Sequence, residues 1–214
     1  MEFESVDAAA AIDILLLLLI GIGPKIALVP FLDVTADMPE ATKRRVVRKM
    51  LVTAAAVAVV LLVLGGLLTR LLHFSAGALG VSSGIILLII AITMVLGGSG
   101  EQQASKLNGQ DPMRLAVFPL AVPYLLNPAG IVVLVTASAE ATTLGVYGIV
   151  LGALVVVMLL DVVVFRWAAQ VGEHLNENSM LVTEKVFGFL LAALAVQLAL
   201  DGLADLGVIH LLHH

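Results

Sequence analysis

The sequence contains no cysteine, and charged residues make up only 13% of its 214 residues. Without cysteine the chain can form no disulfide, no thiolate nucleophile and no thiolate metal site. The five histidines include no pair with the spacing of a zinc motif. Paired intramembrane aspartates, a His-Glu zinc signature and a Gly-rich Lys-Ser/Thr loop for ATP are also absent. We therefore expect no enzyme, no ATP-driven pump and no bound cofactor.

The composition instead indicates an integral membrane protein. Hydrophobic residues make up 61% of the chain, and the mean hydropathy is +1.12, well above the values of soluble domains. Six apolar runs approach or exceed the roughly 20 residues that a helix needs to cross hydrocarbon. They cover about residues 12–34, 48–72, 78–98, 115–137, 144–168 and 184–203. We predict an all-α protein with six transmembrane helices, surrounded by the lipid bilayer.

The distribution of Lys and Arg predicts the orientation in the plasma (inner) membrane, because cytoplasmic loops are enriched in these residues. On one side only Arg70 appears, whereas the other side carries Lys43, Arg44, Arg45, Arg48, Lys49, Lys106, Arg114, Arg166 and Lys185. Both termini are therefore expected outside. The acidic N-terminus lacks the basic region of a cleaved signal. A formal net charge of −5 without a basic aqueous domain excludes a nucleic-acid partner.

The second apolar run begins inside a longer predicted helix. Asp37 and Glu40 resemble a capped helix start, and the helical pattern continues from there to Leu72, longer than the membrane core. We interpret the five cations in residues 43–49 as residues that set the membrane orientation and anchor the helix at the lipid headgroups. A binding site for a lipid or a partner protein is the alternative.

The two halves of the sequence match at a fixed interval. Gly23-Pro24 and Asn127-Pro128 are 104 residues apart (127 − 23), and Gly84–Gly98 aligns with Gly188–Gly202 at the same interval. Each half contains three spans, so the second copy must enter the membrane upside down. We predict one membrane domain built from two inverted three-helix repeats, residues 1–104 and 105–214.

Spans one and four are interrupted by proline and glycine at corresponding positions. Proline removes a backbone donor and breaks the helix, and unpaired backbone at membrane depth is tolerated only inside protein or along a wet cavity. A helix that restarts at Pro24, or at Pro128 with Asn127 as N-cap, offers free N–H groups to an anion such as a carboxylate. Kinks that serve packing alone are the alternative. The predicted substrate contacts at the breaks are Gly23, Pro24, Lys25, Asn127, Pro128, Ala129 and Gly130.

Two charged residues fall inside predicted spans, where charges are costly and usually functional. Lys25 is interpreted as an anion contact or ion substitute, and Asp161 as its counter-charge, a contact for a substrate amine or a proton carrier. Snorkelling of Lys25 and wetting of Asp161 near an interface are the alternatives. Thr93 and Gln197 are assigned to the same cavity, with interhelical hydrogen bonding as an equally good explanation.

Small residues spaced four apart also predict close contact between helices. The two pairs of this kind are Gly80 with Gly84 and Gly148 with Gly152.

Several segments together resemble the MarC family of multi-pass membrane proteins, related to proposed small neutral amino acid transporters. The most specific is "PLAVPYLLNPAGI", residues 119–131, and "GPKIALVPFLDVT", "RRVVRK", "SSGIILLIIAITMVLGG" and "GFLLAALAVQLALDGL" extend the likeness over nearly the whole chain. The family's first span usually reads Asp-Pro and then Gly-Asn. Here Gly23 replaces the Asp, Ile26 and Ala27 replace Gly-Asn, and Lys25 is added, which suits a more anionic ligand.

These observations predict a secondary transporter for a small solute that bears a carboxylate, with a small neutral amino acid implied by the family resemblance. Coupling to H⁺ or Na⁺ is expected, and a homo-oligomer is left open. One alternative is a flippase or transporter for an anionic lipid whose phosphate meets Lys25. Another is a non-transporting membrane scaffold, which tightly packed breaks without a cavity around Lys25 would indicate.

Overall fold

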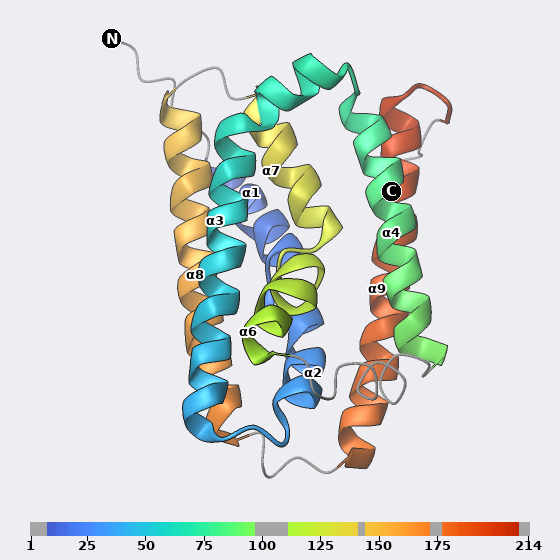
Figure 1. The fold of residues 1–214 in the computed structure, drawn as a ribbon. Coiled ribbons are helices and arrows are strands. Elements are labelled where there is room, and N and C mark those ends of the chain that lie inside the picture. The colour runs from blue at the N-terminus through green and yellow to red at the C-terminus, as the bar shows by residue number, and fades with distance from the viewer. Residues whose placement is uncertain (1–7, 97–110, 141–143, 172–176, 210–214) are drawn as a thin grey trace.

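The computed structural model describes residues 8–96, 111–140, 144–171 and 177–209. Four helices in this part of the chain are long and apolar enough to cross a membrane. They are α3 (Glu40–Leu72), α4 (Ala76–Leu96), α8 (Leu144–Val171) and α9 (Glu177–Asp205) (Figure 1). The predicted helical membrane architecture is thus found in the structure. Helix α3 begins at Glu40, but the predicted side-chain cap from Asp37 is wrong, since Pro39 is the N-cap residue and no side chain caps the helix.

The other apolar segments are interrupted where the sequence predicts. The first consists of α1 (Ala8–Gly21) and α2 (Pro24–Thr35), and the second of α6 (Pro112–Leu115), η1 (Ala116–Leu125) and α7 (Pro128–Glu140). Inside η1, Phe118 and Val122 have extended backbone angles. Each precedes a proline, whose ring disfavours the α conformation of the residue before it. The two prolines therefore disrupt the helical backbone of η1 at two positions before the main break at residues 126–127.

Figure 1 shows how these elements alternate in direction. The α1–α2 segment descends in that view, whereas the segment from α6 to α7 rises between the long helices. Helix α3 rises beside the descending α8, and α4 descends beside the rising α9. The core contains two groups of buried side chains, a larger one shared by α1, α2, α3, η1, α7 and α8, and a smaller one between α4 and α9 that also includes Ile26.

Helices α4 and α9 approach closely because glycine and alanine occupy their shared face. A Cβ atom on Gly84 would lie 2.7 Å from the Ala195 carbonyl oxygen, and Gly80 faces Gly202. The close packing predicted for Gly80 and Gly84 is confirmed. The same prediction for Gly148 and Gly152 is wrong, since no neighbour lies within 4 Å of a Cβ at either position; the face of α8 that carries them is exposed.

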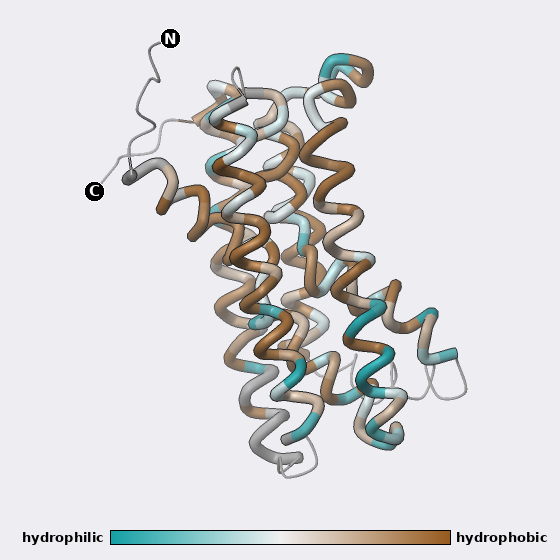
Figure 2. The backbone as a smooth tube through the Cα atoms, turned by 90° about the vertical axis from the view of Figure 1, so that its left-hand side faces the viewer, coloured by the Kyte–Doolittle hydropathy of each residue, from teal (hydrophilic) through white to brown (hydrophobic). Residues whose placement is uncertain are grey.

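The outer surface of the bundle is strongly apolar. Large side chains such as Val63 and Phe189 are about two-thirds exposed, and Figure 2 shows hydrophobic residues along the middle of the long helices with hydrophilic ones mainly toward their ends. A soluble protein rarely exposes such an area, whereas lipid tails are its natural surroundings. An apolar middle between polar ends suits a protein that spans a bilayer.

Substitution of Gly84 by alanine should destabilise the protein, because the added methyl group must push apart the backbones of α4 and α9. Overpacking of this kind typically costs about 1–3 kcal/mol. Gly152→Ala is the matched control, since its methyl group has free space and alanine favours helix by about 0.5–1 kcal/mol. Thermal unfolding of the detergent-purified variants measures both effects. Equal melting temperatures for the two variants would contradict the packing.

Candidate functional site

The two helix breaks cross each other at the centre of the bundle. Helix α1 ends at Gly21 and η1 ends at Leu125, and in each case two residues separate it from the next helix. Between them, Ile22 and Leu126 form an isolated antiparallel β-bridge, and both side chains are fully buried. The two breaks therefore lie against each other, with backbone paired directly to backbone.

Glycine makes this crossing sterically feasible. A Cβ atom on Gly21 would overlap the backbone of Gly130, and one on Gly130 would overlap the Gly21 carbonyl group. Side chains at either position would separate the two segments. Gly130, predicted as a substrate contact, is thus first of all a packing position.

Asn127 joins the end of α1 to the beginning of α7. Its backbone N–H donates to the Gly21 carbonyl (3.0 Å), and its Nδ2 donates to the Ile20 carbonyl (2.9 Å). Its Oδ1 accepts from the Gly130 N–H at 3.1 Å, which is the predicted N-cap bond. The negative end of the α1 dipole therefore faces the positive end of α7, and Asn127 itself is fully buried.

The start of α2 has no equivalent cap. Gly23, which occupies the position matched to Asn127, has an extended backbone and makes no side-chain cap bond. Pro24 carries no N–H, and Lys25 follows it with a partly buried side chain. Of the two helix starts at the crossing, the α2 start therefore keeps more of its positive electrostatic field.

Asp161 is a fully buried carboxylate on α8, and neither of its oxygens has a hydrogen-bond partner. One helical turn further along, Phe165 packs edge-on against Phe31 of α2, with ring centroids 5.4 Å apart. Asp161 lies on the same face of α8 as Phe165, because residues four apart share a helix face. This face is turned toward the interrupted first segment.

Lys25 and Asp161 do not form the predicted ion pair, since the Asp161 oxygens have no partner. The helical period explains this. Side chains turn by about 100° per residue around a helix, so Ala27 shares the face of Phe31 that meets α8. Lys25, two residues before Ala27, is rotated by about 200° around the helix from Ala27 and therefore projects from nearly the opposite side.

The remaining predicted site residues lie elsewhere. Thr93 on α4 and Gln197 on α9 are both exposed. The Thr93 hydroxyl donates to the Ile90 carbonyl at 2.7 Å, and Gln197 donates to Asp201 one turn later at 2.7 Å. The structure therefore does not bring these two side chains together with the breaks. In the described residues no three His, Asp or Glu side chains gather into a metal-binding group.

One segment of the sequence matches a catalytic motif, and the fold shows that it does not have that motif's structure. Residues 80–84 read Gly-Val-Ser-Ser-Gly, which fits the letters Gly-x-Ser-x-Gly. A hydrolase places that serine on a sharp turn between a strand and a helix. Here the segment lies within α4, and the Ser82 hydroxyl donates to the Leu79 carbonyl. The motif therefore does not form a nucleophile elbow.

Comparison with known proteins agrees with this architecture. The sequence profile of the MarC family integral membrane proteins matches residues 9–206, which include both breaks and all four long helices up to their ends. The chain belongs to the MarC family. The resemblance seen in the sequence is thereby confirmed, and the protein is a multi-pass integral membrane protein.

Individual MarC relatives are distant but cover most of the chain. A UPF0056 membrane protein of Methanocaldococcus jannaschii is 25% identical over 81% of this chain and 85% of its own length. YvbG of Bacillus subtilis is 25% identical over 81% and 84%. The inner membrane protein YhgN of Escherichia coli is 26% identical over 81% and 85%. No solved structure matches the chain significantly.

Replacement of Asn127 by alanine should destabilise this MarC protein by roughly 2 kcal/mol or more, because two buried hydrogen bonds disappear and the Ile20 carbonyl loses a donor. Asn127→Asp separates the two roles, since it keeps the acceptor for Gly130 but sets an oxygen against the Ile20 carbonyl. Thermal unfolding in detergent measures both. Ser82→Ala, at an exposed position, is the control. An unchanged melting temperature for Asn127→Ala would show that the crossing does not depend on this side chain.

Proposed function

We propose that the protein is a secondary transporter that works by alternating access and moves a small solute bearing a carboxylate, with a small neutral amino acid as the expected substrate. The observation that carries this proposal is the crossing of two interrupted membrane segments at mid-span. Interrupted helices whose ends meet near the membrane midplane are the usual binding sites of secondary transporters. Backbone of this kind is costly to keep in a membrane, which argues for a functional purpose.

Contacts between the halves support the proposed inverted repeat. The breaks begin at Gly21 and Leu125, which are 104 residues apart (125 − 21). Gly84 contacts Ala199, and the pair shifted by the same interval, Gly188 with Val95, is also in contact. Such reciprocal contacts are what a two-fold axis between the halves produces. The opposite directions of corresponding helices in Figure 1 agree with it.

The electrostatics of the crossing favour an anionic group at the α2 start. A substrate carboxylate there would meet the uncapped N–H groups of α2 and the Lys25 ammonium. At the α7 start, Asn127 occupies the Gly130 N–H, so Pro128, Ala129 and Gly130 become available to a ligand only when Asn127 moves. The two starts therefore play unequal roles in our proposal, with Lys25 making the first contact.

Asp161 is assigned the coupling proton. A charge on a buried carboxylate without a partner is costly, which suits a group that takes up a proton in one state and releases it in another. A single carboxylate also matches one proton better than Na⁺, because metal cations in proteins gather several oxygen ligands. Its position facing the first interrupted segment links its protonation to movement of that segment.

The closed crossing corresponds in this proposal to a state with the pathway shut. Gly21, Ile22, Gly23 and residues 127–130 are all buried, so a conformational change must separate the segments before a solute enters. The same tight packing favours the scaffold alternative, in which the breaks never open. Transport measurements distinguish the two.

Purified protein in liposomes should take up labelled alanine, glycine or serine faster when the outside is more acidic than the inside. Lys25→Ala should raise the KM for the solute at least several-fold, since it removes the cationic contact. Asp161→Asn should retain exchange of solute between both sides and lose accumulation driven by the proton gradient.

The control for both variants is Gln197→Ala, at an exposed position away from the breaks. Movement of no amino acid by folded wild-type protein would favour the scaffold over a transporter. Transport that is unchanged in both Lys25→Ala and Asp161→Asn would leave a transporter whose site lies elsewhere.

A further inference from the structure

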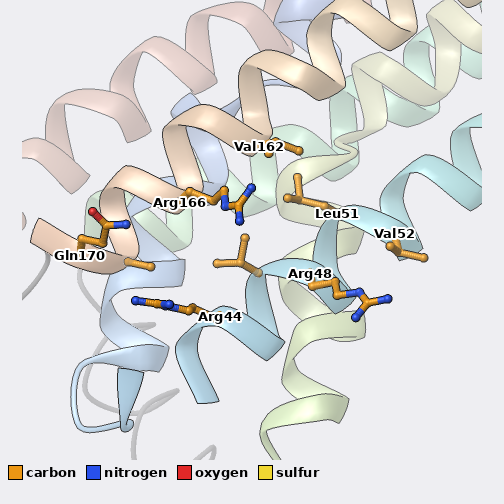
Figure 3. Close-up of a pocket in the computed structure, with 9 residues that line it drawn as sticks. Arg44, Arg48, Leu51, Val52, Val162, Arg166 and Gln170 are labelled. Atoms are coloured by element: carbon orange, nitrogen blue, oxygen red, sulfur yellow. The ribbon is translucent and has the colours of Figure 1, made fainter. Parts of the chain in front are cut away.

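A pocket of about 440 Å³ lies between α3 and α8, outside the crossing of the breaks. It is lined by Arg44, Val47, Arg48, Leu51, Val52, Val162, Arg166, Ala169 and Gln170. Figure 3 shows Arg166 reaching from α8 toward α3, with Arg44 and Arg48 extending to opposite sides on α3. Three guanidinium groups and one amide thus border a space whose remaining walls are aliphatic.

The pocket changes character along its length. On α3 the lining extends from Arg44 to Val52, about 12 Å at 1.5 Å per residue, with Arg44 and Arg48 toward one end and Leu51 and Val52 at the other. Because α8 runs in the opposite direction, Gln170 and Arg166 lie beside the basic part and Val162 beside the apolar part. An occupant with a charged group at one end and an aliphatic chain at the other fits this order.

The basic part has an excess of positive charge. Arg44 lies 3.7 Å from the Glu40 carboxylate, but both side chains are largely exposed, so the pair contributes little. Among the residues that the structure describes, no carboxylate forms a salt bridge with Arg48 or Arg166. Guanidinium groups bind phosphate through paired hydrogen bonds, so an anionic phosphate is the complementary ligand.

The position of the pocket indicates where that phosphate comes from. Its basic part is at the end of α3 that carries five of the chain's 11 Lys and Arg residues. Val52 on α3 and Val163 on α8 are more than half exposed on the apolar outer surface. The apolar part is therefore open toward lipid tails. A free phosphate ion would leave these aliphatic walls unfilled, whereas a phospholipid fills both parts.

We propose that the pocket between α3 and α8 binds an anionic phospholipid, with its phosphate between Arg48 and Arg166 and an acyl chain along Leu51, Val52 and Val162. Basic pockets between transmembrane helices at the cytoplasmic side suit such headgroups. The site is separate from the proposed solute pathway, so it stands whether or not the protein transports amino acids.

Native mass spectrometry of the full-length protein, titrated with phosphatidylglycerol or phosphatidylethanolamine of identical acyl chains, tests the proposal. Wild type should bind phosphatidylglycerol at least several-fold more tightly than phosphatidylethanolamine. The double variant Arg48→Gln/Arg166→Gln should lose about tenfold in phosphatidylglycerol affinity, since it removes the charge-assisted bonds. Arg166→Lys should give an intermediate loss because it keeps the charge without the paired geometry.

The matched control is Arg45→Gln/Arg114→Gln, which removes the same charge from the same end of the protein but outside the pocket lining. It should change affinity less than twofold. Equal losses in both double variants would overturn the site in favour of general surface attraction, and equal binding of the two lipids would overturn the headgroup preference.

Inorganic phosphate provides a further arm. Full displacement of phosphatidylglycerol by millimolar phosphate would identify a small-anion site instead of a lipid site. Size-exclusion chromatography checks folding, and the single variants Arg48→Gln and Arg166→Gln replace the double variant if it does not remain monodisperse; unchanged lipid binding in both single variants would equally overturn the proposal.

Discussion

The need to pair backbone polar groups at membrane depth governs this structure. Two helices stop near the centre of the bundle, and their unpaired carbonyl and N–H groups have no water to bind. Asn127 satisfies several of them at once by bonding Ile20, Gly21 and Gly130. Glycines at the contact let the two segments approach closely enough for those bonds. The interrupted helices, the glycines and the buried amide are therefore one arrangement.

The two halves use that arrangement unequally. Asn127 caps the second restart, whereas Gly23 at the matched position cannot cap the first. The α2 start has no side-chain cap, and Ile26 packs it against the α4–α9 pair. The two helix starts at the crossing therefore differ, since α7 is capped by the Asn127 side chain and α2 has no side-chain cap and carries Lys25 in its first turn.

Sequence reasoning predicts features that depend on local chemistry. Proline forces the breaks, asparagine before proline predicts the cap, and apolar length predicts the membrane helices. It fails where the answer depends on which face of a helix meets a neighbour. Gly148 and Gly152 have the same spacing as Gly80 and Gly84 but lie on an open face. Lys25 projects from another side of α2 than Phe31, which packs against α8.

The pocket between α3 and α8 is a feature that sequence reasoning does not predict. In the sequence Arg166 contributes only to the predicted orientation, and Arg44 and Arg48 belong to a general basic stretch. Only the antiparallel placement of α3 and α8 brings them around one space. Which residues line a pocket between two helices depends on tertiary packing, and the sequence of neither helix alone predicts it.

The bond from Asn127 to Ile20 spans 107 residues, and this has a consequence for biosynthesis. The ribosome synthesises the first interrupted segment well before the second. The Ile20 carbonyl group in the nascent protein therefore lacks the Asn127 amide that later donates a hydrogen bond to it. Helices α1 to α4 are therefore synthesised before this hydrogen bond can form.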